Sequence, residues 1–407
     1  MKSIFIIIIM ILSIFLYSNT LTVKQDGTGD YSIIQMAVEN SVTGDTILVY
    51  PGTYYENVDL TEKDITLGSL NMIANDFTYI STTIIDGNHT GSCILILDTN
   101  NTSVIGFTLQ HGSGTITPGS SQAAAGGGLR IKNSTARIKN NVLINNFSWY
   151  GGGIATYNSI VNFSGNIIIK NHSILTGGGI NLGVNSIVEF NEENLNSIYL
   201  NSSCRGNDIS IYRSDMNIIL DKFTVINPDN FYIANKEGSY TFNCNEEVIT
   251  PVENDLFVST GGNDSNSGLT ADDALQTITY ALILIKADSL HQRTIHIANG
   301  IYSQSLTNEL FPLNMKSYVS LIGESEENTI IDGENGNYQI MTGYDGEQNV
   351  EIKNFTIKNI IYNLAVISFS FNMIADEIIR FSVKLENITI ENISPFIRIS
   401  RKCDETG

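Results

Sequence analysis

The sequence repeats one motif, Gly-Gly-Gly followed by Leu or Ile, three times: Gly126–Leu129, Gly151–Ile154 and Gly177–Ile180. The motifs start 25 and 26 residues apart. A fixed period of about 20–50 residues is typical of repeat proteins, in which each repeat forms one structural layer. The three motifs therefore predict a stack of similar coils in this part of the chain.

Short β-branched runs such as Ile160–Phe163 and Ile167–Ile169 lie between these motifs and are bounded by Asn, Gly and Ser, as expected for strands. Two-residue Asn-Gly hairpin turns are scarce, which disfavours an antiparallel meander. We therefore predict an all-β fold, a single-stranded parallel β-helix (β-solenoid). Its corners need positive φ, which Gly adopts freely and Asn tolerates. Corner asparagines that could hydrogen-bond along the stack are Asn140, Asn141, Asn166 and Asn171.

A second, longer repeat divides the chain into two modules. Thr46–Tyr54 resembles Thr294–Tyr302 at an offset of 248 residues, and Thr83–Gly87 matches Thr329–Gly333 at an offset of 246. We predict a first β-helix module over 21–245, a linker over 246–255 and a second module over 256–407. The second module ends without a recognisable capping domain, so truncation at the C-terminus stays open.

Each module begins with a short helical pattern that could cover its first coil, since uncovered sheet edges invite aggregation. In the first pattern Ser32 and Gln35 have the spacing of a capping box, and Ile34, Ala37 and Val38 share one helical face. In the second, Thr277 is placed to cap the helix that follows.

Composition and the N-terminus predict a protein that is exported from the cell. The apolar run from Ile4 to Leu16 predicts a secretory signal peptide over 1–20, with an uncleaved anchor as the alternative, and no other segment is long enough for a transmembrane helix. The net charge of −20 argues against a nucleic-acid partner. Export permits disulfides, and among four cysteines we favour the pair Cys204–Cys244, with free buried thiols as the alternative.

Several stretches carry family resemblances. The opening Asp26–Val38, followed by Pro51–Val58, resembles pectin-lyase-like right-handed parallel β-helix proteins, including pectin methylesterases. Val258–Gly268 resembles a secreted β-helix module found in bacterial surface proteins and in some calcium-dependent pectate lyases. Phe163–Asn166 before Gly177–Ile180 resembles the repeats of polymorphic outer-membrane adhesins, with Gly in place of their Ala. The resemblances imply a right-handed coil and a secreted or outer-membrane-surface location.

Motifs for catalysis are weak. Resemblance to pectin methylesterases implies paired aspartates and an arginine in downstream motifs, which the chain lacks. Arg130-Ile131-Lys132 imitates a polygalacturonase Arg-x-Lys, but we interpret it as a strand with Ile131 inward. An acidic loop offers three possible Ca²⁺ ligands, with a solvated turn as the alternative: Asp264, Asp272 and Asp273.

We therefore expect an exported surface protein, adhesin-like or glycan-binding, that acts as a monomer on an extracellular polysaccharide or a host or cell-surface protein. Three aromatic residues beside the glycine motifs could stack on sugars: Trp149, Tyr150 and Tyr157. Two alternatives stay open. One is a calcium-dependent polysaccharide lyase or glycoside hydrolase acting on acidic polysaccharides, and the other is a passive structural stalk. No cofactor other than Ca²⁺ is expected.

Overall fold

The computed structural model describes residues 18–119, 123–212, 215–235, 238–344, 349–361, 367–370 and 383–393. Most of the predicted signal peptide and Cys403 lie outside these residues. Among the described residues, no helix is both long and apolar enough to cross a membrane.

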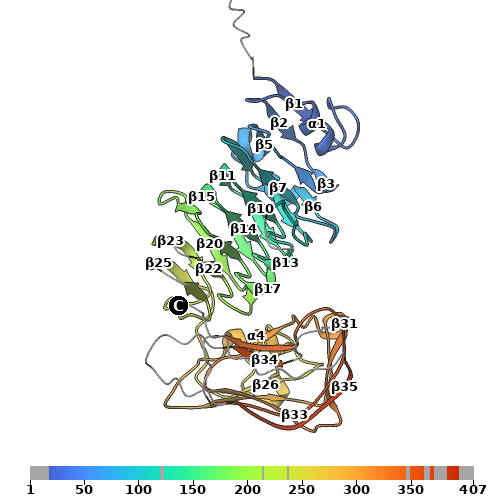
Figure 1. The fold of residues 1–407 in the computed structure, drawn as a ribbon, viewed down its shortest axis with the longest axis vertical. Coiled ribbons are helices and arrows are strands. Elements are labelled where there is room, and N and C mark those ends of the chain that lie inside the picture. The colour runs from blue at the N-terminus through green and yellow to red at the C-terminus, as the bar shows by residue number, and fades with distance from the viewer. Residues whose placement is uncertain are drawn as a thin grey trace, which may run out of the picture.

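The chain is a right-handed parallel β-helix, as predicted, and successive coils of its first module descend in Figure 1. The paired strands of the module are parallel, and most keep one register from coil to coil, for example Ile154 with Leu129 and Ile180 with Ile154. Single-strand winding brings the chain back to each sheet once per coil, so one residue type can form a column along the stack. The aligned Leu129, Ile154 and Ile180 are such an inward column, with no exposed surface.

Four sheets form module 1, which we define as the coils of β1 to β25. Sheet A contains β1 (Thr20–Val23), β2 (Thr46–Val49), β5 (Thr66–Ser69), β8 (Thr102–Ile105), β11 (Thr135–Lys139), β15 (Ile160–Ser164) and β19 (Ile187–Phe190). Sheet B contains β3 (Gly52–Tyr55), β6 (Thr83–Asp86), β9 (Thr108–Gln110), β12 (Val142–Ile144), β16 (Ile167–Ile169), β20 (Asn196–Tyr199), β23 (Met216–Phe223) and β25 (Tyr240–Glu247). Sheet C contains β4 (Val58–Asp59), β7 (Ile94–Leu97), β10 (Leu129–Lys132), β14 (Ile154–Tyr157), β18 (Ile180–Leu182), β22 (Ile209–Ile211) and β24 (Ile233–Asn235). Sheet D contains β13 (Phe147–Tyr150), β17 (His172–Thr176) and β21 (Ser202–Ser203).

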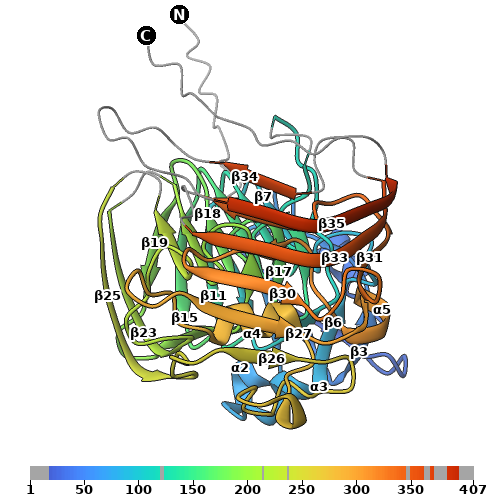
Figure 2. The same cartoon turned by 90° about the horizontal axis from the view of Figure 1, so that it is seen from below.

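Module 2, the coils of β26 to β35, has two sheets, and the strands of the larger one lie one above another in Figure 2. The larger sheet contains β26 (Leu256–Val258), β27 (Arg293–Ile297), β28 (Gly300–Tyr302), β30 (Val319–Gly323), β31 (Thr329–Gly336), β33 (Val350–Ile360) and β35 (Val383–Ile393). The smaller sheet contains β29 (Leu313–Asn314), β32 (Met341–Tyr344) and β34 (Ile367–Ser370). The described helices are α1 (Ile34–Asn40), α2 (Asn71–Ala74), α3 (Thr78–Thr82), α4 (Ile278–Leu284), α5 (Gln304–Thr307) and the 3-10 turn Ala271–Asp273.

The glycine motifs have two separate geometric causes. Only the first glycine of each motif, such as Gly151 with φ +64°, occupies the left-handed region that the corner requires. The second is constrained by close packing, because a Cβ at Gly152 would lie 2.4 Å from the carbonyl oxygen of His172. Gly206, with φ +63°, continues the column one coil further, although it lacks the triplet and was not predicted.

Two buried asparagine ladders, rather than one, run along module 1. Asn141, Asn166 and Asn196 form the first, in which the Oδ1 atoms of Asn166 and Asn196 each accept from the backbone N–H and the side-chain amide of the asparagine one coil before. The second joins Asn146, Asn171 and Asn201 in the same way and ends on Oδ1 of Asp208. Asn140 also hydrogen-bonds along the stack, as expected, but outside these two ladders: its Nδ2 donates to Asn71 Oδ1, and its Oδ1 accepts from Asn194 Nδ2.

The longer repeat, with its offset of 248 residues, corresponds to matched hydrogen bonds in the two modules. Tyr54 Oη donates to the carbonyl oxygen of Tyr50 over 2.9 Å, and Tyr302 Oη donates to that of Ala298 over the same distance. Both hydroxyls also lie 3.4 Å from a second carbonyl oxygen, that of Val23 or of Val258. The two modules therefore build their first coils in the same way.

The two cap helices share a capping interaction that was not predicted from the sequence. The carboxylate of Glu56 accepts from the backbone N–H groups of Ile34 and Gln35 at the start of α1. The predicted capping box was wrong, since Ser32 does not cap α1. At α4, Glu309 plays the role of Glu56, and Thr277 also caps the helix, as predicted, by accepting from Tyr280 N–H.

The predicted disulfide was wrong. Cys204 follows β21 in sheet D, whereas Cys244 lies in β25 of sheet B, and both are buried thiols. The two residues lie on different faces of the coil, so export alone does not bring their sulfurs together.

Candidate functional site

The last coils of module 1 contact the first coils of module 2 through polar bonds. Tyr232 Oη donates to the carbonyl oxygen of Ile283 in α4 over 2.7 Å. Asn314 Nδ2, at the end of β29, donates to Asn207 Oδ1 over 3.2 Å. Because these groups are buried, the contacts fix how the two modules meet.

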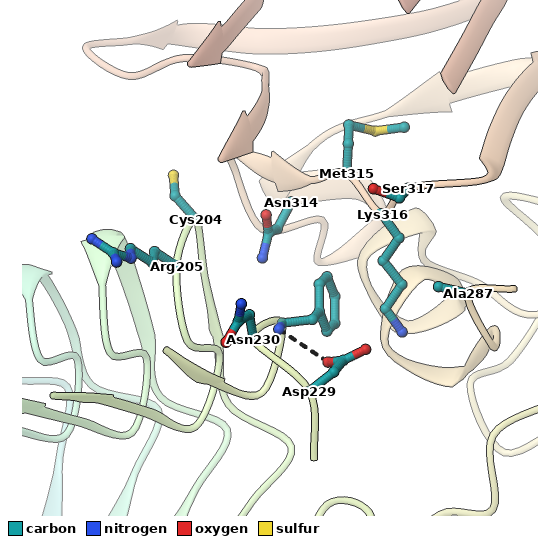
Figure 3. A pocket seen from close by; sticks show the side chains of 10 residues that line it. Cys204, Arg205, Asp229, Asn230, Ala287, Asn314, Met315, Lys316 and Ser317 are labelled. Atoms are coloured by element: carbon teal, nitrogen blue, oxygen red, sulfur yellow. Dashed lines mark hydrogen bonds between the residues drawn. The ribbon is translucent and has the colours of Figure 1, made fainter. Parts of the chain in front are cut away.

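A cavity of about 250 Å³ lies at this junction and draws its walls from both modules. The side chains that surround it are shown in Figure 3. Its lining residues are Cys204, Arg205, Asp229, Asn230, Phe231, Ala287, Asn314, Met315, Lys316 and Ser317. The lining therefore combines both signs of charge, two side-chain amides and one aromatic ring.

Corners of the coils position the module 1 side of the cavity. Cys204 and Arg205 precede Gly206 at the corner between β21 and β22. Phe231 precedes β24, and its N–H donates to Asp229 Oδ1 over 3.0 Å, which fixes the turn that carries Asn230. Asp229 and Asn230 are exposed at the rim.

Lys316 lies on the module 2 side and is 5% exposed. Its ammonium donates to the carbonyl oxygens of Ile283 and Ile285 at the C-terminal end of α4, and it lies 3.2 Å from Tyr232 Oη. It also lies 4.0 Å from the centre of the Phe231 ring, a cation–π distance. Burial lowers the pKa of Lys316 to about 7, and the negative charge of Asp229 opposes this shift. Lys316 thus ties α4 to the last coil of module 1.

The three aromatic residues predicted to face a glycan do not line this cavity. Trp149 and Tyr150 are half-buried in β13, where Trp149 N–H donates to the carbonyl oxygen of Ala124. Tyr157 is half-buried in β14, and Lys132 Nζ lies 5.7 Å from its ring centre. The structure places these residues on neighbouring strands of one region of module 1, and their role in binding stays a prediction.

Arg130 and Lys132 do lie on one strand with Ile131 inward, as interpreted from the sequence. Their side chains are nevertheless only 4% exposed, because the segment before β10 covers them. Arg130 donates to Thr117 Oγ1 and Lys132 to the carbonyl oxygen of Pro118. Burial lowers the pKa of Arg130 to about 10.

Two of the three predicted calcium ligands form hydrogen bonds within the protein. Asp264 accepts from the N–H groups of Gln276 and Thr277 and so supports the start of α4. Asp273 accepts from the N–H and hydroxyl of Ser267, while Asp272 is exposed. Within the described part of the chain, no group of three or more His, Cys, Asp or Glu side chains could hold a metal ion. The structure therefore does not gather these three residues into a metal-binding group, and calcium binding by them stays a prediction.

Sequence reasoning missed the cavity because its walls come from four separate segments that share no motif. One available signal was the composition of α4, since Ile283, Leu284 and Ile285 extend its apolar surface beyond one face. A helix that is apolar all round is buried on several sides. That pattern could have indicated that the second cap helix lies in an interface.

Comparisons with known proteins give one family match and several similar solved structures. Residues 260–398 match a family described as a protein of unknown function (DUF1565). Among curated proteins, none matches the sequence significantly.

Similar solved structures include a pectin methylesterase from carrot, at 11% identity and a TM-score of 0.27, covering 91% of this chain and 87% of that one. An exopolygalacturonase of family 28 from Yersinia enterocolitica has 12% identity and a TM-score of 0.26, with 93% and 78% covered. A polygalacturonase from Erwinia carotovora ssp. carotovora has 11% identity and a TM-score of 0.21, with 94% and 96% covered. Its own stacked parallel sheets show that the chain has a right-handed parallel β-helix fold.

Proposed function

We propose that this is an exported glycan-binding protein whose binding site is the cavity between its two modules. The observation that carries the proposal is the lining: Phe231 stands among hydrogen-bonding side chains contributed by both modules. A sugar ring has an apolar C–H face and a rim of hydroxyls. An aromatic ring packs against the face, while amide, guanidinium and carboxylate groups pair with the hydroxyls.

The size and position of the cavity suit one unit of a longer glycan. Its volume of about 250 Å³ is close to the lower end of small-molecule sites, roughly 300 Å³. Asp229 and Asn230 are exposed at the rim, so neighbouring sugar units can extend over the surface. We propose binding rather than hydrolysis because the described lining residues include one carboxylate, Asp229, whereas glycosidases generally use a pair.

A glycan array followed by calorimetry on the glycans that bind tests this proposal. Asn230→Trp fills the cavity from an exposed rim position, and we expect at least a tenfold loss of affinity. Asn243→Trp is the matched control, since Asn243 is exposed on β25 and does not line the cavity, and it should bind as the wild type does.

Two outcomes would contradict the proposal. If Tyr157→Ala abolishes binding and Asn230→Trp leaves it unchanged, the glycan binds the aromatic region of module 1. If no glycan on the array binds, the glycan-binding function itself is wrong.

A further inference from the structure

His172 is a buried titratable residue that joins the two modules. It lies at the start of β17 in module 1 and is 5% exposed. Its Nε2 lies 2.6 Å from the carbonyl oxygen of Phe311 in module 2, and its Nδ1 lies 3.1 Å from that of Ser202 in the next coil. The ring also stacks on Phe147, with 5.7 Å between ring centres.

The segment that His172 holds carries the module 2 side of the cavity. Phe311 precedes β29, and the residues from Asn314 to Ser317 all line the cavity. The hydrogen bond from His172 therefore fixes the chain just before four lining residues. It acts beside the Asn314–Asn207 and Lys316–Tyr232 contacts described above.

Chemistry decides which form of the ring suits the closed junction. A neutral imidazole has one N–H donor, and the 2.6 Å contact to an acceptor places it on Nε2. An imidazolium would gain a second hydrogen bond, from Nδ1 to the carbonyl oxygen of Ser202. It would also be a buried cation with no carboxylate partner among the described residues, and the loss of hydration of such a charge outweighs one added hydrogen bond. Burial accordingly lowers the pKa of His172, against the opposing effect of the two carbonyl oxygens.

Other titratable groups lie near this junction, and their contributions to any pH dependence must be distinguished from that of His172. They are Cys204 after β21, Asp208 at the end of the second asparagine ladder, Glu309 two residues before Phe311, and Lys316. Burial raises the pKa of Asp208 and of Glu309 to about 7. A pH effect on the junction is therefore assigned to His172 only by comparison with a variant that lacks the imidazole.

We propose that His172 is a positioning residue whose neutral form keeps the two modules docked, so that acidification opens the junction and takes the cavity apart. The undocked ring binds protons with the ordinary pKa of histidine, about 6.5, and the docked ring with a lower one. Opening therefore increases as the pH falls below about 6.5 and levels off below the docked pKa. The inference concerns the junction and holds whatever ligand the cavity binds.

The thiol of Cys204 reports opening without any ligand, because it is 3% exposed and lines the cavity. We would label the full protein with 4,4′-dithiodipyridine at pH 5.5 and 7.5 and measure labelling of Cys204 relative to the buried Cys93 by peptide mass spectrometry. In the wild type the ratio should rise at pH 5.5, by up to about tenfold, because this pH lies about one unit below the ordinary pKa of the undocked ring. His172→Gln keeps a donor near the Nε2 position without titrating, and its ratio should change little with pH.

His291→Gln removes an exposed histidine from module 2 and should behave as the wild type does. Equal pH dependence in the wild type and His172→Gln would overturn the proposal, as would stronger protection of Cys204 at pH 5.5. If His172→Gln does not fold, an NMR titration of the wild-type imidazole decides instead. A pKa at or above 6.5 for His172 contradicts the proposal, and a lower one supports it.

Discussion

The two cap helices begin their modules in the same way but meet different surroundings. Their inner faces match, since Ile34, Ala37 and Val38 of α1 and Ile278, Ala281 and Leu282 of α4 are all buried against the first coil. The next two residues differ. Glu39 and Asn40 of α1 are exposed, whereas Ile283 and Leu284 of α4 are buried at the module junction.

The difference shows that the outer face of a cap helix decides whether it ends a β-helix or joins two of them. A helix with one apolar face can cover a coil and still face water, whereas a helix that is apolar on several sides needs a second partner. The capping carboxylates follow the same division, because Glu56 is half-buried and Glu309 has no exposed surface.

The largest effect is expected when the outer faces are exchanged. Ile283→Glu places a carboxylate at a site that is 5% exposed, next to Tyr232, and should destabilise the junction by more than about 3 kcal/mol. Glu39→Ile at the exposed position of α1 should change stability by less than about 0.5 kcal/mol. Urea unfolding followed by circular dichroism measures both. Equal effects would show that the outer face of α4 is not what joins the modules.

The asparagine ladders give the next largest contrast. Asn171 is fully buried, accepts from Asn146 and donates to Leu143 and Asn201, so Asn171→Ala leaves several buried groups unpaired. We expect a loss of about 3 kcal/mol from module 1. In module 2, Asn387 is exposed and donates to Asn354, so Asn387→Ala should cost less than about 0.5 kcal/mol. A comparable loss of stability in both variants would mean that burial does not determine how much these hydrogen bonds stabilise the protein.

Local rules predicted much of the fold because each coil repeats the same short-range constraints. Phe163 and Asn166, chosen from an adhesin-like repeat, are a core residue and a ladder residue. Thr277 caps α4, and Tyr302 repeats the contacts of Tyr54, because these features depend on residues close in sequence or on a repeated register.

The same rules failed where contacts join distant segments. Arg205, Phe231 and Lys316 meet at the cavity although more than 80 residues separate the last two, and no spacing in the sequence links them. The calcium prediction grouped Asp264 with Asp273 by their closeness in sequence, but backbone N–H groups attract each carboxylate to a different place. The prediction of a capping box at Ser32 was wrong for a similar reason, because the backbone N–H of Ile34 donates to Glu56, which lies later in the coil.

The third prediction concerns pH and the two capping glutamates. Burial raises the pKa of Glu309 to about 7, above the ordinary value near 4.3 in an unfolded chain. The folded state therefore holds its proton more tightly, and module 2 should lose stability, on the order of 2 kcal/mol, as the pH rises from about 4.5 to 7. In Glu309→Gln this dependence should be flatter, as measured by urea unfolding at several pH values. Glu56→Gln is the matched control, and an unchanged slope in Glu309→Gln would contradict the assignment.

The smallest effect is expected at a hydrogen bond that the two modules have in common. Tyr54→Phe and Tyr302→Phe each remove a hydroxyl that donates to a carbonyl oxygen four residues earlier over 2.9 Å. Each should cost about 1 kcal/mol, because both rings are buried and each carbonyl oxygen loses the same kind of donor. Differential scanning calorimetry of the single and double variants measures the two losses. They should be equal and additive, since the hydroxyls share no partner. A loss confined to one variant would show that the matched contacts do not stabilise both modules equally, and the first coils of the two modules would then differ as the outer faces of their cap helices do.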